Sequence, residues 1–133
     1  QKVVYNIRVI MSPKRVLEIL RHEGVGAIVT QNKEAVHMVN TWNSYLIVTP
    51  DNRFLNPVGG MKTTEANLAV NEQIQMSLGS HEVDGLHHKG AGFHIKGTAK
   101  IIYDGNDLEL VKARFPWARA VLSIQPEFFV QTA

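Results

Sequence analysis

The segment that spans residues 39–67 holds the side chains and the loop best suited to bind a ligand. Its first part, VNTWNSYL, places two asparagines, a threonine, a serine and two aromatic residues within eight positions. Its second part, PVGGMKTTEAN, is a proline–glycine–glycine loop that leads into a predicted helix. Amides and aromatic rings recognise planar heterocycles, and free N–H groups at a helix start bind phosphate. The two parts together predict a site for a phosphorylated, planar, aromatic ligand.

The glycine loop has the composition of a phosphate-binding turn. The adjacent Gly59 and Gly60 allow the backbone to approach a ligand closely or to take a positive φ. Beyond them, the helix start offers unpaired N–H donors and a partial positive charge. Lys62 adds a cation, and Thr63 and Thr64 add hydroxyls. The alternative interpretation is a strand-to-helix turn in which a threonine is merely the N-cap.

The polar and aromatic run at residues 40–45 cannot face a ligand as one regular strand. Strict alternation puts its members on opposite faces: Asn40, Trp42 and Ser44 on one, and Thr41, Asn43 and Tyr45 on the other. A ligand then meets only one set, unless a bulge or kink re-aims part of the strand. On composition alone, a half-buried strand with aromatic side chains in the core is the favoured interpretation.

Composition excludes several classes of protein. The chain has 133 residues, enough for one domain, and its 44% hydrophobic and 20% charged residues are ordinary for a globular protein. It has no cysteine, which excludes disulfides, iron–sulfur clusters and thiol catalysis. No apolar run approaches the roughly 20 residues of a membrane span, and no signal peptide is visible, so we expect a cytoplasmic protein without membrane contact.

Other motifs of known chemistry are also missing from the sequence. The net charge is +2, and the densest basic group lies on one predicted helix with apolar positions between, so no nucleic-acid surface is expected. His81, His87, His88 and His94 lack the spacing of a zinc site, so no metal is predicted. There is no Gly-x-Gly-x-x-Gly and hence no Rossmann-type NAD(P)H domain, no P-loop and no Gly-x-Ser-x-Gly.

Hydrophobic periodicity and turn residues predict a mainly β antiparallel barrel of about six strands with short helices. A first helix begins with Ser12 as N-cap and Pro13 in the first turn, and stops at Gly24. Residues 79–92 are predicted to be a long polar loop. Residues 2–10 alternate in part, which predicts an edge strand, with an appended non-native segment as the alternative. The other predicted strands are 25–30, 36–42, 53–58, 73–78, 93–103 and 117–130, the last interrupted near residue 126. Residues 43–48 either continue the 36–42 strand after a bend or form another strand, and the other predicted helices are 63–71 and 108–115.

Three runs, VNTWNSYL, PVGGM and FPWARA, resemble the small FMN-binding proteins of sulfate-reducing bacteria. These belong to the flavin-binding split-barrel superfamily, whose wider members include pyridoxamine 5′-phosphate oxidases and flavin reductases. The resemblance extends from about residue 11 to the C-terminus, so residues 1–10 are an extension or edge strand and residues 11–133 the domain. It implies a six-stranded antiparallel split β-barrel of Greek-key type, FMN as cofactor, and a homodimer with FMN near its interface.

The resemblance also implies which residues bind the cofactor. They are Glu23, Asn40, Thr41, Trp42, Asn43, Ser44, Tyr45, Pro57, Val58, Gly59, Gly60, Met61, Lys62, Thr63, Thr64, Asn67 and Trp117. For Trp117 the alternative is a core anchor at a strand start, and for Glu23 it is a solvated helix end. The family's lysine lies one position later than Lys62, where this chain has Thr63, so either residue is a candidate to meet the phosphate.

No nucleophile or acid–base pair stands out, and no catalytic residue is predicted. The favoured function is therefore an electron-transfer flavoprotein in which FMN is the redox centre and the redox partner is unidentified. One alternative is an NAD(P)H-dependent flavin reductase or an oxidase of the pyridoxamine-phosphate type. Another is a non-enzymatic ligand-binding or interaction module that has lost its flavin.

Overall fold

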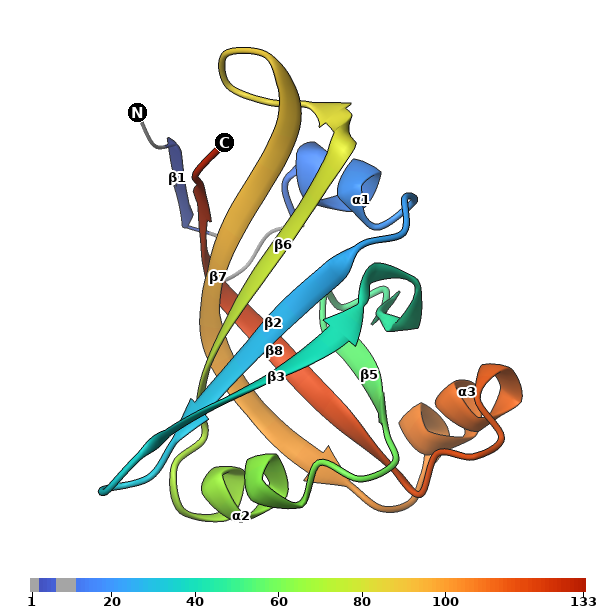
Figure 1. Ribbon diagram of the computed structural model, residues 1–133. Coiled ribbons are helices and arrows are strands. Elements are labelled where there is room, and N and C mark those ends of the chain that lie inside the picture. The colour runs from blue at the N-terminus through green and yellow to red at the C-terminus, as the bar shows by residue number, and fades with distance from the viewer. Residues whose placement is uncertain (1–2, 7–11) are drawn as a thin grey trace.

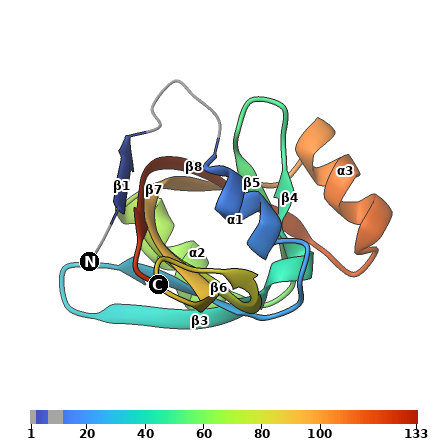
Figure 2. The ribbon, with the colours of Figure 1, turned by 90° about the horizontal axis from the view of Figure 1, so that it is seen from above.

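One antiparallel sheet curls around the core in the computed structural model, which describes residues 3–6 and 12–133 (Figures 1 and 2). Its strands are β1 (Val3–Asn6), β2 (Val25–Gln31), β3 (Val36–Trp42), β4 (Ile47–Val48), β5 (Phe54–Val58), β6 (Gln73–Asp84), β7 (Lys89–Ile102) and β8 (Ala120–Gln131). The helices are α1 (Lys14–Ile19), α2 (Lys62–Val70) and α3 (Asn106–Arg114), with a 3₁₀ turn, η1 (Asn43–Tyr45), between β3 and β4.

The strands run in the order β3-β2-β6-β7-β8-β5-β4, so β3 and β4 are the ends of the path. β1 pairs with the C-terminal part of β8, beside the stretch that pairs with β5. The mainly β class with short helices is confirmed, but the predicted count of six strands is wrong. The described chain has seven strands along the path and β1 in addition, because the two-residue β4 forms a hairpin with β5 and β1 joins β8.

Buried side chains of the long strands β6, β7 and β8 build the core, and in β6 and β7 they alternate with more exposed ones. In β6 the side chains of Ile74, Met76 and Leu78 are buried, and β7 and β8 add Phe93 and Phe129, whose rings meet edge to face. α1 and α2 lie at opposite ends of the curled sheet (Figure 1) and bury apolar residues against it. The sheet, closed at both ends by these helices, is a rigid frame for the loops at its rim.

The predicted loop at residues 79–92 is wrong, because most of it is a β-hairpin. β6 continues to Asp84 and β7 begins at Lys89, with Gly79 opposite Gly92. Val83 is buried as well, but it follows a register shift between Ser80 and Asp84, so the alternation of β6 does not continue unbroken to the tip. Glycines and histidines suggested a loop, yet a hairpin arm tolerates them where its neighbour supplies the backbone partners.

The first helix differs from its prediction at both ends. Pro13, not Ser12, is its N-cap, because the backbone N–H and hydroxyl of Ser12 both donate to the side-chain oxygen of Asn52, at 2.9 and 2.6 Å. α1 ends at Ile19, before the predicted stop at Gly24. The interruption near Pro126 is confirmed by a register shift between β7 and β8. Of the predicted edge strand at 2–10, residues 2 and 7–10 lie outside the described residues, as does residue 11.

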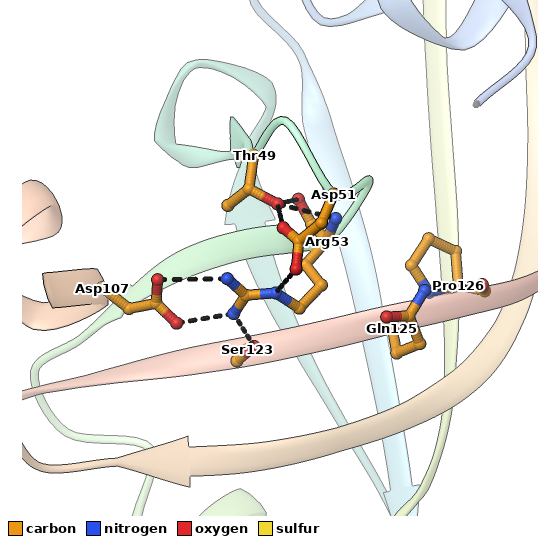
Figure 3. A network of polar contacts seen from close by, with 7 residues as sticks. All are labelled: Thr49, Asp51, Arg53, Asp107, Ser123, Gln125 and Pro126. Carbon is orange, nitrogen blue, oxygen red and sulfur yellow. Dashed lines mark hydrogen bonds and ion pairs between the residues drawn. The ribbon is translucent and has the colours of Figure 1, made fainter. Parts of the chain in front are cut away.

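A charged network fixes α3 against the sheet (Figure 3). The guanidinium of Arg53 donates to Asp107 at 2.5 and 3.2 Å, to Ser123 at 2.9 Å and to Asp51 at 2.9 Å. The hydrogen bonds to Asp107 and Asp51 raise the pKa of Arg53 above its ordinary value. Because α3 leads directly into the FPW run, this network fixes the chain that carries Trp117.

Candidate functional site

A pocket of about 220 Å³ lies where the end of β3, the η1 turn, the end of β5 and the FPW run meet. Its lining is Asn40, Thr41, Trp42, Tyr45, Asn56, Pro57, Gly59, Gly60, Met61 and Trp117. All of these except Asn56 are residues that the sequence predicts for the site. Segments far apart in the chain therefore meet at one place, and they present amides, a hydroxyl, aromatic rings and a glycine loop.

The η1 turn is the kink that the alternation argument required. β3 ends at Trp42, and the 3₁₀ turn that follows brings Tyr45 to the same pocket as Trp42, which strict alternation would place on the opposite face. The turn directs Asn43 inward, where its side-chain N–H₂ donates to the carbonyls of His22 at 3.0 Å and Gly79 at 3.2 Å. Asn43 is fully buried and does not line the pocket, so in this structure it anchors the turn.

A buried hydrogen bond joins the two sides of the pocket. The Thr41 hydroxyl donates to the side-chain oxygen of Asn56 at 2.5 Å, and the Asn56 N–H₂ donates to the carbonyl of Pro57 at 3.0 Å. Since its proton is already used, the Thr41 oxygen is left to accept a hydrogen bond from a ligand. Sequence reasoning missed Asn56, although an asparagine inside the apolar run FLNPV is a visible signal.

Three aromatic rings form a cluster beside the pocket. Tyr45 lies 5.0 Å from Phe115 and 5.8 Å from Trp117 between ring centroids, and Phe115 lies 5.8 Å from Trp117. The alternative in which Trp117 is a core anchor is wrong, because its side chain is 52% exposed. Trp42, at 46%, is exposed as well. Large exposed aromatic rings at a pocket are typical of ligand or partner contacts.

The start of α2 offers unpaired donors. Met61, with a left-handed φ of 56°, is the N-cap, and no side chain caps the helix, so the interpretation with a threonine N-cap is wrong. The backbone N–H groups of Lys62, Thr63 and Thr64 form no hydrogen bond in the part of the chain that the structure describes. The hydroxyl of Thr64 is also buried without a partner there. Free donors and an orphaned hydroxyl at a positive helix end fit an anionic group.

A cluster of charged side chains holds the Gly59–Gly60 loop in place. The guanidinium of Arg119 donates to the carbonyls of Gly59 and Gly60, at 2.6 Å each, and to both carboxylate oxygens of Glu65, at 3.0 and 3.2 Å. The Tyr103 hydroxyl donates to the same carboxylate. The hydrogen bonds from Arg119 and then Tyr103 lower the pKa of Glu65 to about 2. Glu65 is therefore ionised at neutral pH.

The remaining predicted residues lie outside the pocket lining. Exposed Glu23 accepts hydrogen bonds from the hydroxyl and N–H of Ser44, at 2.6 and 3.1 Å, and the hydroxyl bond is the main cause of its lowered pKa. Asn67 is buried in α2 and bonds Thr30 and Asn32 through both its polar atoms. Val58 belongs to the core, and Lys62 is exposed, with its Nζ 3.9 Å from Glu65.

Two other properties bear on the kind of site. Within residues 3–6 and 12–133, no group of three or more His, Cys, Asp or Glu side chains is arranged to hold a metal ion. None of the helices in these ranges is long and apolar enough to span a bilayer.

Comparison with known proteins gives one clear relative by sequence. No protein-family model matches the chain. The chain is 51% identical over 114 residues to the FMN-binding protein of Nitratidesulfovibrio vulgaris, and the match covers 86% of this chain and 93% of the relative.

Solved structures agree on the fold at low sequence identity. A structure of HupZ from Group A Streptococcus matches with a TM-score of 0.72 and 17% identity, over 89% of this chain and 92% of HupZ. An FMN-binding protein of Syntrophomonas wolfei matches with a TM-score of 0.67 and 13% identity, over 81% and 76% of the two chains. A candidate pyridoxamine 5′-phosphate oxidase of Lactobacillus delbrueckii matches with a TM-score of 0.66 and 12% identity, over 90% and 93%. The chain thus belongs to the family of this FMN-binding protein, and it shares its fold with these solved structures.

Proposed function

We propose that this protein binds FMN in the pocket between β3, β5 and Trp117, and that it serves as a small electron-transfer flavoprotein. One observation carries the proposal: a single pocket is lined by aromatic rings, amides and the Gly59–Gly60 loop, directly before the unpaired N–H groups of α2. FMN has a planar aromatic ring and a terminal phosphate, which are the two features that such a site recognises. The relative that is 51% identical is named for binding FMN.

The pocket residues would divide the recognition between them. Asn40 has a side-chain amide without a hydrogen bond in the described chain, and Thr41 has a free acceptor, so these two suit the polar edge of the ring or its sugar. The N–H groups of the glycine loop and the α2 start suit the phosphate. Lys62 is exposed and Thr63 begins the same turn, so either can add to the phosphate contacts. When bound, FMN supplies one- or two-electron transfer.

An exposed aromatic side chain supports a carrier role. The side chain of Trp117 is about half exposed, so a flavin beside it lies near the protein surface. Electrons can then pass to a partner protein that touches this surface, without a buried route. The protein would supply binding, orientation and tuning of the redox potential, and the flavin the chemistry.

A homodimer is the second part of the proposal. Val36, Met38 and Trp42 alternate on the outer face of the edge strand β3 and are 67%, 65% and 46% exposed, with the exposed Val25 paired to Trp42. We call these four residues the β3 face. An apolar face on a sheet edge invites a partner. Because Trp42 belongs both to this face and to the pocket, a second copy here would bring FMN close to the interface.

We also place the protein in the cytoplasm. The complete lack of cysteine fits a compartment in which proteins are not stabilised by disulfides. Cell fractionation with an antibody to the chain tests this point.

Titration of the apoprotein with FMN tests the binding, and anaerobic reduction then tests the role. We expect saturable quenching of flavin fluorescence at one FMN per chain. A carrier is reduced by dithionite and re-oxidised by a protein acceptor, whereas NADH or NADPH alone leaves its absorbance unchanged. Rapid bleaching by either nucleotide would instead indicate a flavin reductase. Failure to bind any FMN would reject the flavoprotein function.

A further inference from the structure

Arg119 holds three consecutive carbonyls of the glycine loop. Its backbone N–H donates to the carbonyl of Val58 at 2.9 Å, its Nε to that of Gly59 at 2.6 Å, and one Nη to that of Gly60 at 2.6 Å. No other described side chain hydrogen-bonds to the carbonyls of Gly59 or Gly60. The loop is thus attached along its whole length to the residue that immediately precedes β8.

This attachment sets the direction of the loop's N–H groups. In a planar trans peptide the N–H points opposite to the C=O of the same unit. Since the carbonyls of Gly59 and Gly60 point to Arg119, the N–H groups of Gly60 and Met61 point away from it. Neither N–H forms a hydrogen bond within the described residues, and both belong to residues that line the pocket. Without the hydrogen bonds from Arg119, a contact that we call the Arg119 clamp, the glycine pair would sample many other backbone orientations.

Glu65 in turn holds the guanidinium in place. Its two carboxylate oxygens accept from two different nitrogens of Arg119, and the Tyr103 hydroxyl donates to the same carboxylate. With these bonds, four of the five N–H donors of the Arg119 side chain are used by the protein. Arg119 is therefore arranged to act on the loop rather than on a ligand.

We propose that Arg119 is a positioning residue that makes the site prefer a phosphorylated flavin, FMN, over riboflavin, by fixing the loop N–H groups in the direction that a phosphate needs. The inference rests on the proposed function, because it assigns the loop to the flavin phosphate. A loop that is already ordered loses little conformational freedom when the phosphate binds, and this is the source of the preference. Riboflavin lacks the phosphate, so its binding does not depend on the Arg119 clamp.

The test compares the dissociation constants of FMN and riboflavin in four proteins: the wild type, Arg119→Gln, Arg119→Lys and Arg15→Gln. Arg15→Gln is the matched control, since among the described residues Arg15 forms only a local ion pair, with Glu18 on α1. We expect wild type and control to prefer FMN strongly. In both Arg119 variants the Kd of FMN should rise about tenfold, because neither glutamine nor lysine reproduces the planar fork of N–H groups of the guanidinium. The Kd of riboflavin should change less than about twofold.

The two flavins also separate the possible failures. Unchanged FMN affinity, or an equal loss for FMN and riboflavin, would overturn the positioning role, the latter because it shows a merely structural effect. If Arg119→Gln does not fold, Arg119→Lys, which keeps the charge opposite Glu65, decides the question. A wild type that binds FMN no better than riboflavin would also overturn the inference. A wild type that binds neither flavin would instead reject the proposed function itself.

Discussion

The ring of Trp117 packs directly on the backbone of Gly59: a Cβ at this glycine would lie 3.2 Å from Cζ3 and 3.3 Å from Cε3 of the indole. Such distances are tighter than most packed side chains tolerate, so a side chain at Gly59 would displace the ring by a few tenths of an ångström. Gly60, its neighbour, has open space at the same position. The two glycines therefore differ in what a side chain would disturb. At Gly59 it would disturb the contact with Trp117, and at Gly60 it would disturb the proposed ligand.

Gly60→Val should lower FMN affinity without lowering stability. A Cβ at Gly60 would meet nothing within 4 Å in the protein, but a side chain there would occupy the space through which a phosphate approaches the loop. We expect the Kd of FMN to rise at least about tenfold, with an unchanged melting temperature of the apoprotein. Gly59→Val is the contrasting variant, because it should also displace Trp117 and change the tryptophan fluorescence of the apoprotein. A folded Gly60→Val protein with wild-type FMN affinity would rule out the phosphate loop.

Thr41→Val should destabilise the protein and weaken FMN binding together. The substitution removes the donor to the buried Asn56 oxygen and leaves that acceptor unsatisfied. An unsatisfied buried acceptor costs about 1–3 kcal/mol, which urea unfolding of the apoprotein would measure. Thr41→Ser keeps the hydroxyl and is the control, from which we expect less than half of the loss. A Thr41→Val protein that is as stable as the wild type would show that the hydrogen bond to Asn56 does not contribute.

Trp117→Phe should make bound FMN more fluorescent. An indole beside a flavin quenches its emission by giving an electron to the excited ring, and a phenyl ring is a much poorer donor. Phe115→Leu is the matched control, since Phe115 contacts the same cluster but cannot quench in this way. Time-resolved emission of the bound flavin is the measurement. Lifetimes that lengthen equally in both variants would point to general loosening of the cluster rather than loss of a quencher.

Met38→Lys should produce monomers. Met38 lies in the middle of the β3 face, where a lysine would place a charge opposite apolar residues of a second copy. Val70→Lys is the control, because Val70 is equally exposed but lies on α2, away from that face. Analytical ultracentrifugation should find a dimer for the wild type and for Val70→Lys, and a monomer for Met38→Lys. A wild type that sediments as a monomer would exclude the dimer.

Acid should weaken the ion pair between Arg119 and Glu65 only well below neutral pH. The pKa of Glu65 is lowered from 4.5 to about 2 in the folded protein, mainly by Arg119. The contribution of the ionised carboxylate to stability is therefore complete above pH 4.5 and is lost as the pH falls toward 2. Glu65→Gln should lose this part of the pH dependence while keeping the same stability trend above pH 5. Parallel unfolding curves for the two proteins between pH 5 and 2 would contradict the assignment.

The sequence predicted most of the fold because its alternation and turn residues are local signals. The strands around residues 25–31, 36–42 and 54–58 and the helix α2 lie close to their predicted positions. The hairpin at residues 79–92 was missed because glycines and histidines weaken the alternation, and only pairing between β6 and β7 shows that the strands continue. Ser12 was misassigned because its partner, Asn52, is 40 residues away and no local pattern announces it.

For the site, too, local motifs could be predicted from the sequence, whereas contacts between distant residues could not. The motifs at residues 40–45 and 57–61 are visible in the sequence, and most of their members line the pocket. The inward direction of Asn43 depends on a 3₁₀ turn and on the carbonyls of His22, which follows α1, and of Gly79 in β6, so composition alone cannot reveal it. Arg119 hydrogen-bonds to Gly59 and Gly60, which precede it in the chain by 60 and 59 positions. Only the folded sheet brings these residues together.

The most direct test of the central claim is a visible absorption spectrum of the freshly purified protein, followed by identification of the chromophore released on denaturation. We expect flavin absorption bands, and FMN as the released molecule, or full recovery of these bands when FMN is added to colourless protein. A protein that is colourless as purified and takes up no added FMN would contradict it.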